Sequence, residues 1–160
     1  MDDISAIART MGGACPAIHL RQASRMLARI YDDAFRPLGL ELSQVPVMAT
    51  VAVSGDTGIS IGELARALVL DRTTVTRVIR PLERAGFLRV ARSLDDARSK
   101  IVVVTRAGER VVRAAYPLWE RTTKRVREVF GAGRIDALNA ELTALVALGP
   151  KLGPKRGKQR

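Results

Sequence analysis

Apolar residues recur at the spacing of a helical face along most of this chain, most regularly between residues 60 and 87. Two sets of positions follow the i, i+3, i+4, i+7 pattern: Ile61, Leu64, Ala65 and Leu68, and then Val75, Val78, Ile79 and Leu82. Ser60 and Glu63 match a capping box ahead of the first set, and Asp71 precedes the second as a cap. Gly86 supplies a stop signal. The pattern predicts two short helices joined by a tight apolar turn.

The second predicted helix, residues 71–84, shows solvent a polar face with no acidic residue between positions 72 and 80. The members of this face are Arg72, Thr73, Thr74, Thr76, Arg77 and Arg80. A helix fits the major groove of B-DNA, where arginine binds guanine through two hydrogen bonds and threonine reaches phosphates or a thymine methyl group. We therefore interpret residues 71–84 as the recognition helix of a helix-turn-helix. A solvated helix pair in an ordinary bundle is the alternative. Pro81 predicts a kink or a short first segment.

The hydrophobic period changes after Gly86, where residues 87–92 and 100–105 alternate like strands. The polar residues 93–99 between them read as a hairpin tip. Because a two-stranded hairpin alone is marginally stable, we expect it to pack on the preceding helices, as in a winged helix. Arg98 at the tip is a candidate for the DNA minor groove, braced by Asp96. A solvated charged turn is the alternative for these two residues.

Amphipathic helices are also predicted on both sides of this region. A long one starts at Pro16 and is closed by residues 36–39, and it carries apolar residues on more than one side. A shorter one follows, capped by Ser43 with Pro46 in its first turn, where proline is tolerated. Such surplus apolar surface requires a second packing partner, and a second copy of the chain is the simplest one.

Two further helices are predicted beyond the hairpin. Thr105 caps the first, which runs to about Phe130 and is bent at Pro117. The second covers residues 135–148 and ends at Gly149–Pro150. A two-fold dimer built on these helices and on the long N-terminal helix places two recognition helices one DNA turn apart, which suits a palindromic site.

The predicted fold class is mainly α with a small antiparallel β wing, a winged helix-turn-helix plus a helical dimerisation domain from both termini. Residues 41–105 form the DNA-binding domain, and residues 15–40 and 106–149 form the dimerisation domain. Residues 1–14 are predicted to be a flexible arm, and residues 150–160 a basic tail that contacts phosphates.

The amino-acid composition and net charge favour some classes of protein function and exclude others. The net charge of +11 favours a polyanionic partner, and without the five positive charges of residues 150–160 the chain still carries +6. The single cysteine allows no intrachain disulfide, and no apolar run is long enough for a membrane span. The acidic N-terminus is unlike a signal peptide, so we expect a cytoplasmic protein. With no glycine-rich phosphate loop, metal-ligand cluster or paired nucleophile and base, we predict no enzyme, no metal and no cofactor.

The order of elements and several motifs resemble the multiple antibiotic resistance regulator (MarR) family of bacterial winged-helix repressors. The matching motifs are Leu64-Ala65, Asp71-Arg72-Thr73-Thr74, Leu82-Glu83-Arg84-Ala85-Gly86, Asp96-Ala97-Arg98 and Thr105. The resemblance implies a homodimer that binds a palindromic operator in double-stranded DNA and represses nearby genes. It also implies release by a small aromatic or phenolic effector bound between the dimerisation and DNA-binding lobes. A nonspecific architectural DNA-binding protein, driven by charge, is the competing class.

The resemblance raises two further hypotheses about sites. One branch of the family senses oxidants through a cysteine in the first helix, which makes Cys15 a candidate because helix N-termini favour the thiolate. Counting back from Arg25 and Tyr31 places that cysteine near Ala17 instead, so an inert Cys15 is the alternative. The candidate ligand-lining residues, each alternatively core or surface, are His19, Arg21, Tyr31, Met48 and Trp119.

Overall fold

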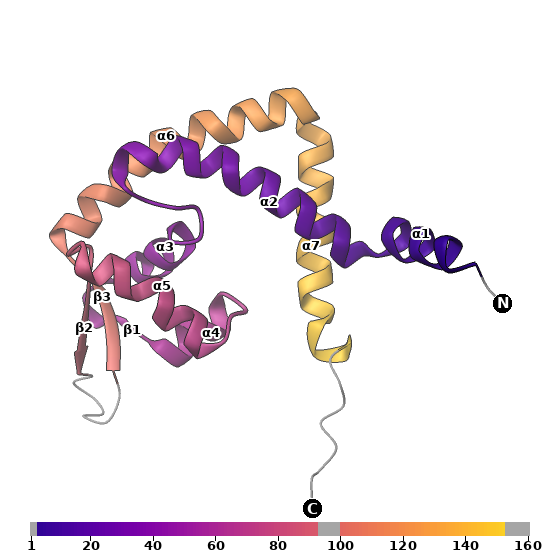
Figure 1. The fold of residues 1–160 in the computed structure, drawn as a ribbon. Helices are drawn as coiled ribbons and strands as arrows, with labels where there is room; N and C mark the ends of the chain where they lie inside the picture. The colour runs from indigo at the N-terminus through magenta and orange to yellow at the C-terminus, as the bar shows by residue number, and fades with distance from the viewer. Residues whose placement is uncertain (1–2, 93–99, 153–160) are drawn as a thin grey trace, which may run out of the picture. The chain divides into compact units, whose positions relative to one another are not determined.

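The computed structural model describes residues 3–92 and 100–152. Its helices are α1 (Ile4–Ala14), α2 (Pro16–Phe35), α3 (Val45–Val53), α4 (Ile61–Ala67), α5 (Arg72–Arg84), α6 (Arg106–Phe130) and α7 (Ala132–Leu152), with short 3-10 turns η1 (Arg36–Leu38) and η2 (Gly55–Thr57) (Figure 1). The strands are β1 (Ile59–Ser60), β2 (Leu88–Arg92) and β3 (Lys100–Val104). The chain divides into a unit of residues 1–120 and a unit of residues 121–160.

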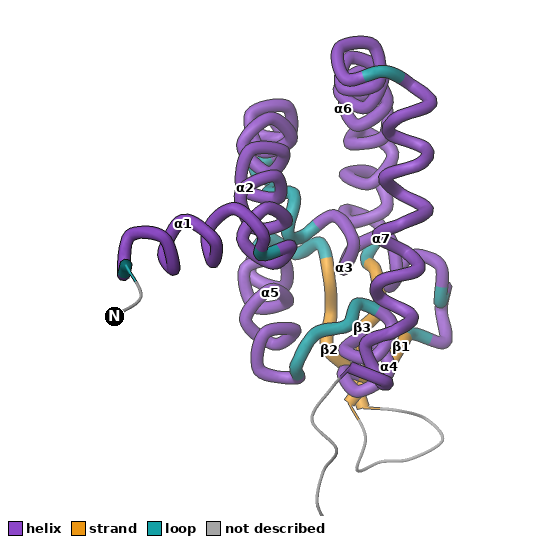
Figure 2. The backbone as a smooth tube through the Cα atoms, turned by 90° about the vertical axis from the view of Figure 1, so that its right-hand side faces the viewer, coloured by secondary structure: helices purple, strands orange, loops and turns teal. Residues whose placement is uncertain are grey.

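The first unit is built around α3, α4, α5 and a small antiparallel sheet, which lie next to one another in Figure 2. The sheet has the order β1-β3-β2, with Leu88 opposite Val104 and Arg92 opposite Lys100. The predicted hairpin is therefore confirmed, but the third strand, β1, was not predicted. A strand of two residues is too short to give a periodic sequence pattern. Strand β1 exists because Ile59 pairs with Val102, which is more than forty residues away in sequence.

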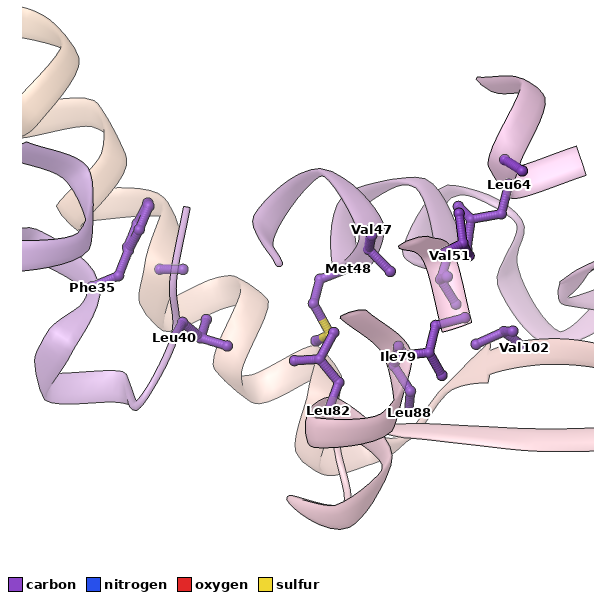
Figure 3. Packing of buried hydrophobic residues seen from close by; sticks show 13 residues of the cluster. Phe35, Leu40, Val47, Met48, Val51, Leu64, Ile79, Leu82, Leu88 and Val102 are labelled. Carbon is purple, nitrogen blue, oxygen red and sulfur yellow. The ribbon is translucent and has the colours of Figure 1, made fainter. Parts of the chain in front are cut away.

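The core of this unit collects apolar side chains from every layer (Figure 3). Its fully buried members include Phe35 of α2, Val47, Met48 and Val51 of α3, Leu64 of α4, Val75 and Leu82 of α5, and Leu88 and Val102 of the sheet. The buried positions of α4 and α5 are all among those that the helical spacing predicted, whereas the predicted Ile61, Leu68 and Val78 are partly buried. At about 25 cal/mol per Å² of apolar area removed from water, this cluster is the main stabilising element of the winged helix.

Thr105 joins the end of α5 to the start of α6. Its Oγ1 donates to the carbonyl oxygen of Gly86 at 2.6 Å and accepts from the Gly108 backbone N–H at 3.0 Å, which confirms it as the helix cap. Its own N–H donates to the Phe87 carbonyl oxygen at 3.0 Å. A Cβ on Gly108 would lie 2.1 Å from that same oxygen, so only glycine allows α6 to approach so closely.

Three boundaries differ from the sequence-based expectations. Residues 4–14 form helix α1 where we predicted a flexible arm, because Asp3 caps Ser5 N–H and Ile4, Ile7 and Met11 follow helical spacing. Ser43 does not cap α3, which begins two residues later at Val45 with Gln44 as its N-cap. Helix α7 starts at Ala132 and continues through Gly149–Pro150 to Leu152, so these two residues do not end it.

The second unit contains the end of α6 and α7. Arg127 binds Asp136 through two hydrogen bonds of 2.5 and 2.9 Å, and this pairing lowers the pKa of the Asp136 carboxyl. The Arg134 guanidinium lies 4.1 Å from the centroid of the Phe130 ring. These contacts hold the corner at Gly131, the predicted break between the helices.

Candidate nucleic-acid interface

The two helices of the helix-turn-helix start at the predicted caps. Ser60 Oγ accepts from the Glu63 N–H at 3.2 Å, and Glu63 Oε2 accepts from the Ser60 N–H at 3.0 Å, which completes the capping box. At the start of α5, Asp71 Oδ1 accepts from the Thr74 N–H at 2.7 Å. The hydrogen bonds from Ser60 lower the pKa of Glu63, and those from Thr74 lower the pKa of Asp71. Both caps thus favour ionised carboxylates at positive helix ends.

Helix α5 presents a basic face opposite its buried side. Val75, Ile79 and Leu82 are buried in the core. The residues on the opposite side are exposed: Thr73, Arg77, Arg80 and Arg84. Arg72 is also exposed, but it lies at the start of the helix on the side of Val75 and Ile79. This arrangement leaves the predicted recognition face open to a partner.

Two of the predicted DNA-contacting threonines also serve the helix itself. Thr74 Oγ1 donates to Asp71 Oδ2 at 2.7 Å, and Thr76 Oγ1 donates to the Arg72 carbonyl oxygen at 2.8 Å. Their hydroxyl protons are therefore engaged, while their methyl groups and oxygen lone pairs stay available. Thr73, which comes before both, is exposed.

The α4–α5 pair also positions Arg72. A Cβ on Gly62 of α4 would lie 2.8 Å from Nη2 of Arg72, so the guanidinium rests against the Gly62 backbone. Helix α5 runs without a break through Pro81 to Arg84, so Pro81 does not shorten it. Pro81 lacks the N–H that would bind the Arg77 carbonyl oxygen, a loss that water can replace on this exposed side.

A groove of about 440 Å³ lies between α5 and the sheet. It is lined by Ile61, Thr76, Ile79, Arg80, Glu83, Val90, Ala91, Arg92 and Lys100. Thr76 and Arg80 are predicted DNA contacts, whereas the sequence alone assigned no role to Arg92 or Lys100. Their proximity depends on the strand register, in which Arg92 is the direct partner of Lys100.

The MarR family profile matches residues 40–100, from shortly after η1 to the first residue of β3. The M. tuberculosis transcriptional regulator MosR, solved in complex with DNA, is 31% identical with a TM-score of 0.69, covering 83% of this chain and 98% of that chain. The chain belongs to the MarR family. The relatives and the family are transcriptional regulators rather than enzymes.

Two further relatives are informative. The transcriptional activatory protein BadR of Rhodopseudomonas palustris is 35% identical over 95 residues, spanning 58% of this chain and 53% of BadR. The match thus covers about half the length of this curated relative. CouR, a transcriptional repressor bound to a 23-mer DNA duplex, is 23% identical with a TM-score of 0.76, covering 86% of this chain and 96% of that chain. At that identity the likeness to CouR shows the fold alone.

The predicted ligand-lining residues of this MarR-family chain lie in different surroundings. Met48 is fully buried in the core, and Tyr31 packs against the same core beside Phe35. His19 lies twelve residues before Tyr31 on α2, about 18 Å along a helix. Its Nε2 is 2.9 Å from the Gly13 carbonyl oxygen of α1.

The other two candidates are surface residues. Arg21 is exposed on α2, and Trp119 is 42% exposed on α6, with its ring 5.9 Å from that of Tyr116. The five candidates thus differ in burial, and their role in binding an effector stays a prediction.

Cys15 lies at the junction between α1 and α2. It is half-buried and occupies the N-cap position of α2 without a side-chain capping bond, while its carbonyl oxygen accepts from Ile18 and His19. The position agrees with a cysteine at a helix start, and a redox role stays a prediction.

The structure does not describe two predicted elements of the DNA interface. Asp96 and Arg98 at the hairpin tip lie outside the described residues, as do residues 153–160 of the basic tail. Within residues 3–92 and 100–152, no helix is long and apolar enough to cross a membrane.

Proposed function

We propose that this chain is a sequence-specific DNA-binding transcriptional regulator whose helix α5 reads the major groove. The observation that carries the proposal is the division of α5 into a buried apolar side and an exposed side of arginines and threonine. In this assignment Arg77, at the centre of the exposed face, contacts a base edge, and Arg72 and Arg80 make further DNA contacts. The solved MosR–DNA complex, 31% identical to this chain, supports DNA as the partner.

The proposal includes a homodimer on a palindromic operator. Helix α2 exposes Ile18, Met26 and Ile30 to 39%, 54% and 39%, although it is twenty residues long and could bury such side chains. Helix α7 likewise exposes Leu138, Leu145 and Val146. A second copy of the chain covers these apolar surfaces and supplies the second recognition helix that a palindrome requires.

We further propose that the bound dimer represses adjacent genes and is released by a small aromatic or phenolic effector. This part is supported by membership of the MarR family. The relative BadR is named an activatory protein, so the sign of regulation is tested with a reporter gene placed behind the recovered operator. Repression predicts lower reporter output with the protein than without it, and activation predicts the reverse.

The deciding experiment is selection of bound sequences from a random DNA pool at physiological salt. Enrichment of a palindrome with half-sites about 10 base pairs apart is the expected result. The architectural alternative predicts retained DNA without a motif. Substitution of Arg77→Ala is expected to cost about 1–3 kcal/mol at the operator and to reduce discrimination against scrambled DNA. Arg9→Ala in α1, which removes the same charge from an exposed helix, is the matched control.

A further inference from the structure

A side chain of α2 hydrogen-bonds the backbone just ahead of α3. Oδ1 of Asp32, in the last turn of α2, accepts from the Leu42 N–H at 2.6 Å, and the Asp32 side chain is half-buried. Beside this bond, Gln44 Oε1 accepts from the Glu41 N–H at 3.0 Å, and Gln44 is buried. Two successive backbone N–H groups ahead of α3 are thus bound by side chains, and one of these side chains belongs to α2.

Apolar packing also attaches α2 to the winged helix. Phe35 at the end of α2 and Leu40 in the connection to α3 are 0% and 4% exposed and belong to the core (Figure 3). Apolar burial is non-directional, so it holds α2 against the core without fixing one angle. A hydrogen bond is directional and weakens steeply as its geometry bends. The bond between Asp32 and Leu42 therefore selects one angle between α2 and α3.

The junction of the winged helix with α6 is braced more heavily. Thr105 Oγ1 donates to the Gly86 carbonyl oxygen at 2.6 Å and accepts from the Gly108 N–H at 3.0 Å. A Cβ on Gly108 would lie 2.1 Å from the Phe87 carbonyl oxygen, so the two segments are in tight contact. In the connection between α2 and α3, by contrast, a Cβ on the left-handed Gly39 would meet no atom within 4 Å. The α2 side is thus the less constrained of the two.

A small change of angle at this joint is large on the scale of DNA. Helix α5 has 13 residues, which makes it about 20 Å long. A rotation of about 10° displaces a point about 20 Å from the pivot by about 3.5 Å, which is close to the rise of one base pair. The angle between α2 and the winged helix therefore has to be held closely if two recognition helices are to keep a fixed separation.

We propose that the hydrogen bond from Leu42 to Asp32 sets the angle between α2 and the winged helix, and thereby the half-site spacing that the dimer accepts. The inference rests on the proposed function, in which α2 contributes to the homodimer and each copy binds one half-site. Two-fold symmetry applies any change of angle to both recognition helices at once. Asp32 is thus a positioning residue, which acts on operator choice through α5 without touching DNA.

The main test measures binding to operators of different spacing. The half-sites recovered from the random pool are kept, and the spacer between them is lengthened or shortened base pair by base pair. The wild type is expected to prefer one spacing. Asp32→Ala is expected to reduce that preference about 10-fold or more, since a hydrogen bond to a charged group is worth roughly 10- to 100-fold in an equilibrium constant. Its affinity for a duplex with a single half-site is expected to equal that of the wild type.

Asp33 supplies the matched control. It follows Asp32 in the chain, carries the same charge and pairs with Arg36, close by in sequence, while both side chains stay largely exposed. Asp33→Ala removes a negative charge as well, so any general gain in affinity for polyanionic DNA occurs in both variants. The spacing preference of Asp33→Ala is expected to match that of the wild type.

Two further variants separate positioning from folding. Asp32→Asn keeps an acceptor oxygen for the Leu42 N–H and is expected to retain most of the spacing preference. Loss of stability alone would weaken binding to every spacing and to the single half-site by the same factor, so the ratio between spacings would not change. Thermal unfolding followed by circular dichroism measures that loss. If Asp32→Ala does not fold, Asp32→Ser takes its place, because its hydroxyl keeps the site polar but ends short of the carboxylate position.

The outcomes distinguish this inference from the proposed function. If the wild type binds no DNA, or binds DNA without a palindromic motif, the proposed function is wrong and the role of Asp32 falls with it. If the wild type prefers one spacing and Asp32→Ala keeps that preference, the role of Asp32 alone is overturned. Equal loss of preference in Asp32→Asn and Asp32→Ala would also overturn it, and so would the same loss in Asp33→Ala.

Discussion

The winged-helix region and the N-terminal helices are stabilised in different ways. From α3 to β3, every helix and the two longer strands contribute fully or nearly fully buried apolar side chains to one cluster (Figure 3). In contrast, α2 buries a single residue, Phe35, in twenty positions, and α1 buries none. The winged-helix region therefore has a continuous apolar core, whereas α1 and α2 leave most of their apolar side chains exposed, which is the surface that the proposed homodimer covers.

The comparison also separates two kinds of amphipathic helix. The apolar side chains of α5 face one partner surface, so its opposite side is free to be polar and basic. Helix α2 carries apolar residues on two sides, of which Tyr31 and Phe35 face the core and Met26 and Ile30 face solvent. The surface proposed to bind DNA on α5 is thus polar, and the surface proposed to form the dimer on α2 is apolar.

The largest effect is expected in the winged-helix core. Leu64→Ala removes a fully buried side chain and leaves a cavity, which is expected to lower the free energy of unfolding by about 2–5 kcal/mol. Val53→Ala, at a position 90% exposed on α3, is the matched control and is expected to change it by less than about 0.5 kcal/mol. Urea denaturation measures both. Similar losses for the two variants would contradict the assignment of the core.

The next largest effect is expected from substitutions on the exposed side of α2. The double substitution of Met26 and Ile30 to glutamate is expected to weaken the homodimer by about 2 kcal/mol or more, since charges replace apolar contacts in an interface. Sedimentation equilibrium measures the dissociation constant, and circular dichroism checks that helix content is retained. Val53→Glu controls for an added charge at an exposed apolar site. An unchanged dimer would place the interface elsewhere.

A smaller effect is expected inside the winged helix, where α4 and α5 end in the same hydrogen-bond pattern. Leu70 N–H binds the Ala65 carbonyl at the end of α4, and Phe87 N–H binds the Leu82 carbonyl at the end of α5, both at 2.9 Å. The residue that must turn left-handed is Val69 (φ 55°) in the first case and Gly86 (φ 74°) in the second.

This contrast predicts opposite signs for two substitutions. A β-branched residue is strained at positive φ, so Val69→Gly is expected to raise the free energy of unfolding by about 0.5–1 kcal/mol. Gly86→Ala is expected to lower it by about 1–2 kcal/mol. Thermal unfolding followed by circular dichroism measures both shifts. Destabilisation by Val69→Gly would show that other contacts of Val69 outweigh its backbone strain.

The smallest changes in stability are expected from loss of a helix cap and from lowering the pH. Ser60→Ala is expected to cost about 1 kcal/mol, because the Glu63 N–H loses its acceptor. The pKa values of Glu63 and Asp71 are lowered in the folded state, so the stabilisation from both caps is present above their unfolded pKa values, near 4. It is lost as the pH falls through the lowered values. Urea midpoints between pH 3 and pH 7 test this, and a smaller acid loss is expected in Ser60→Ala.

The sequence by itself determined the local features of this protein. The capping box of Ser60 and Glu63, the Asp71 cap and the Thr105 cap each involve residues within four positions of one another, so their pattern is visible without the fold. The buried side of α5 followed from helical spacing for the same reason. The basic face of α5, and with it the candidate DNA interface, is the opposite side of that pattern.

Only the tertiary structure decided the features that join distant segments. Strand β1 exists through pairing with β3, and Gly108 is required by the Phe87 carbonyl rather than by its own helix. The groove that gathers Arg80, Arg92 and Lys100 depends on the register of β2 against β3 and on the packing of α5. Of the five predicted ligand-lining residues, Met48 and Tyr31 pack in or against the core, and the other three are exposed. Periodicity reports which face of a segment is buried, whereas its neighbours depend on how that face packs against the others.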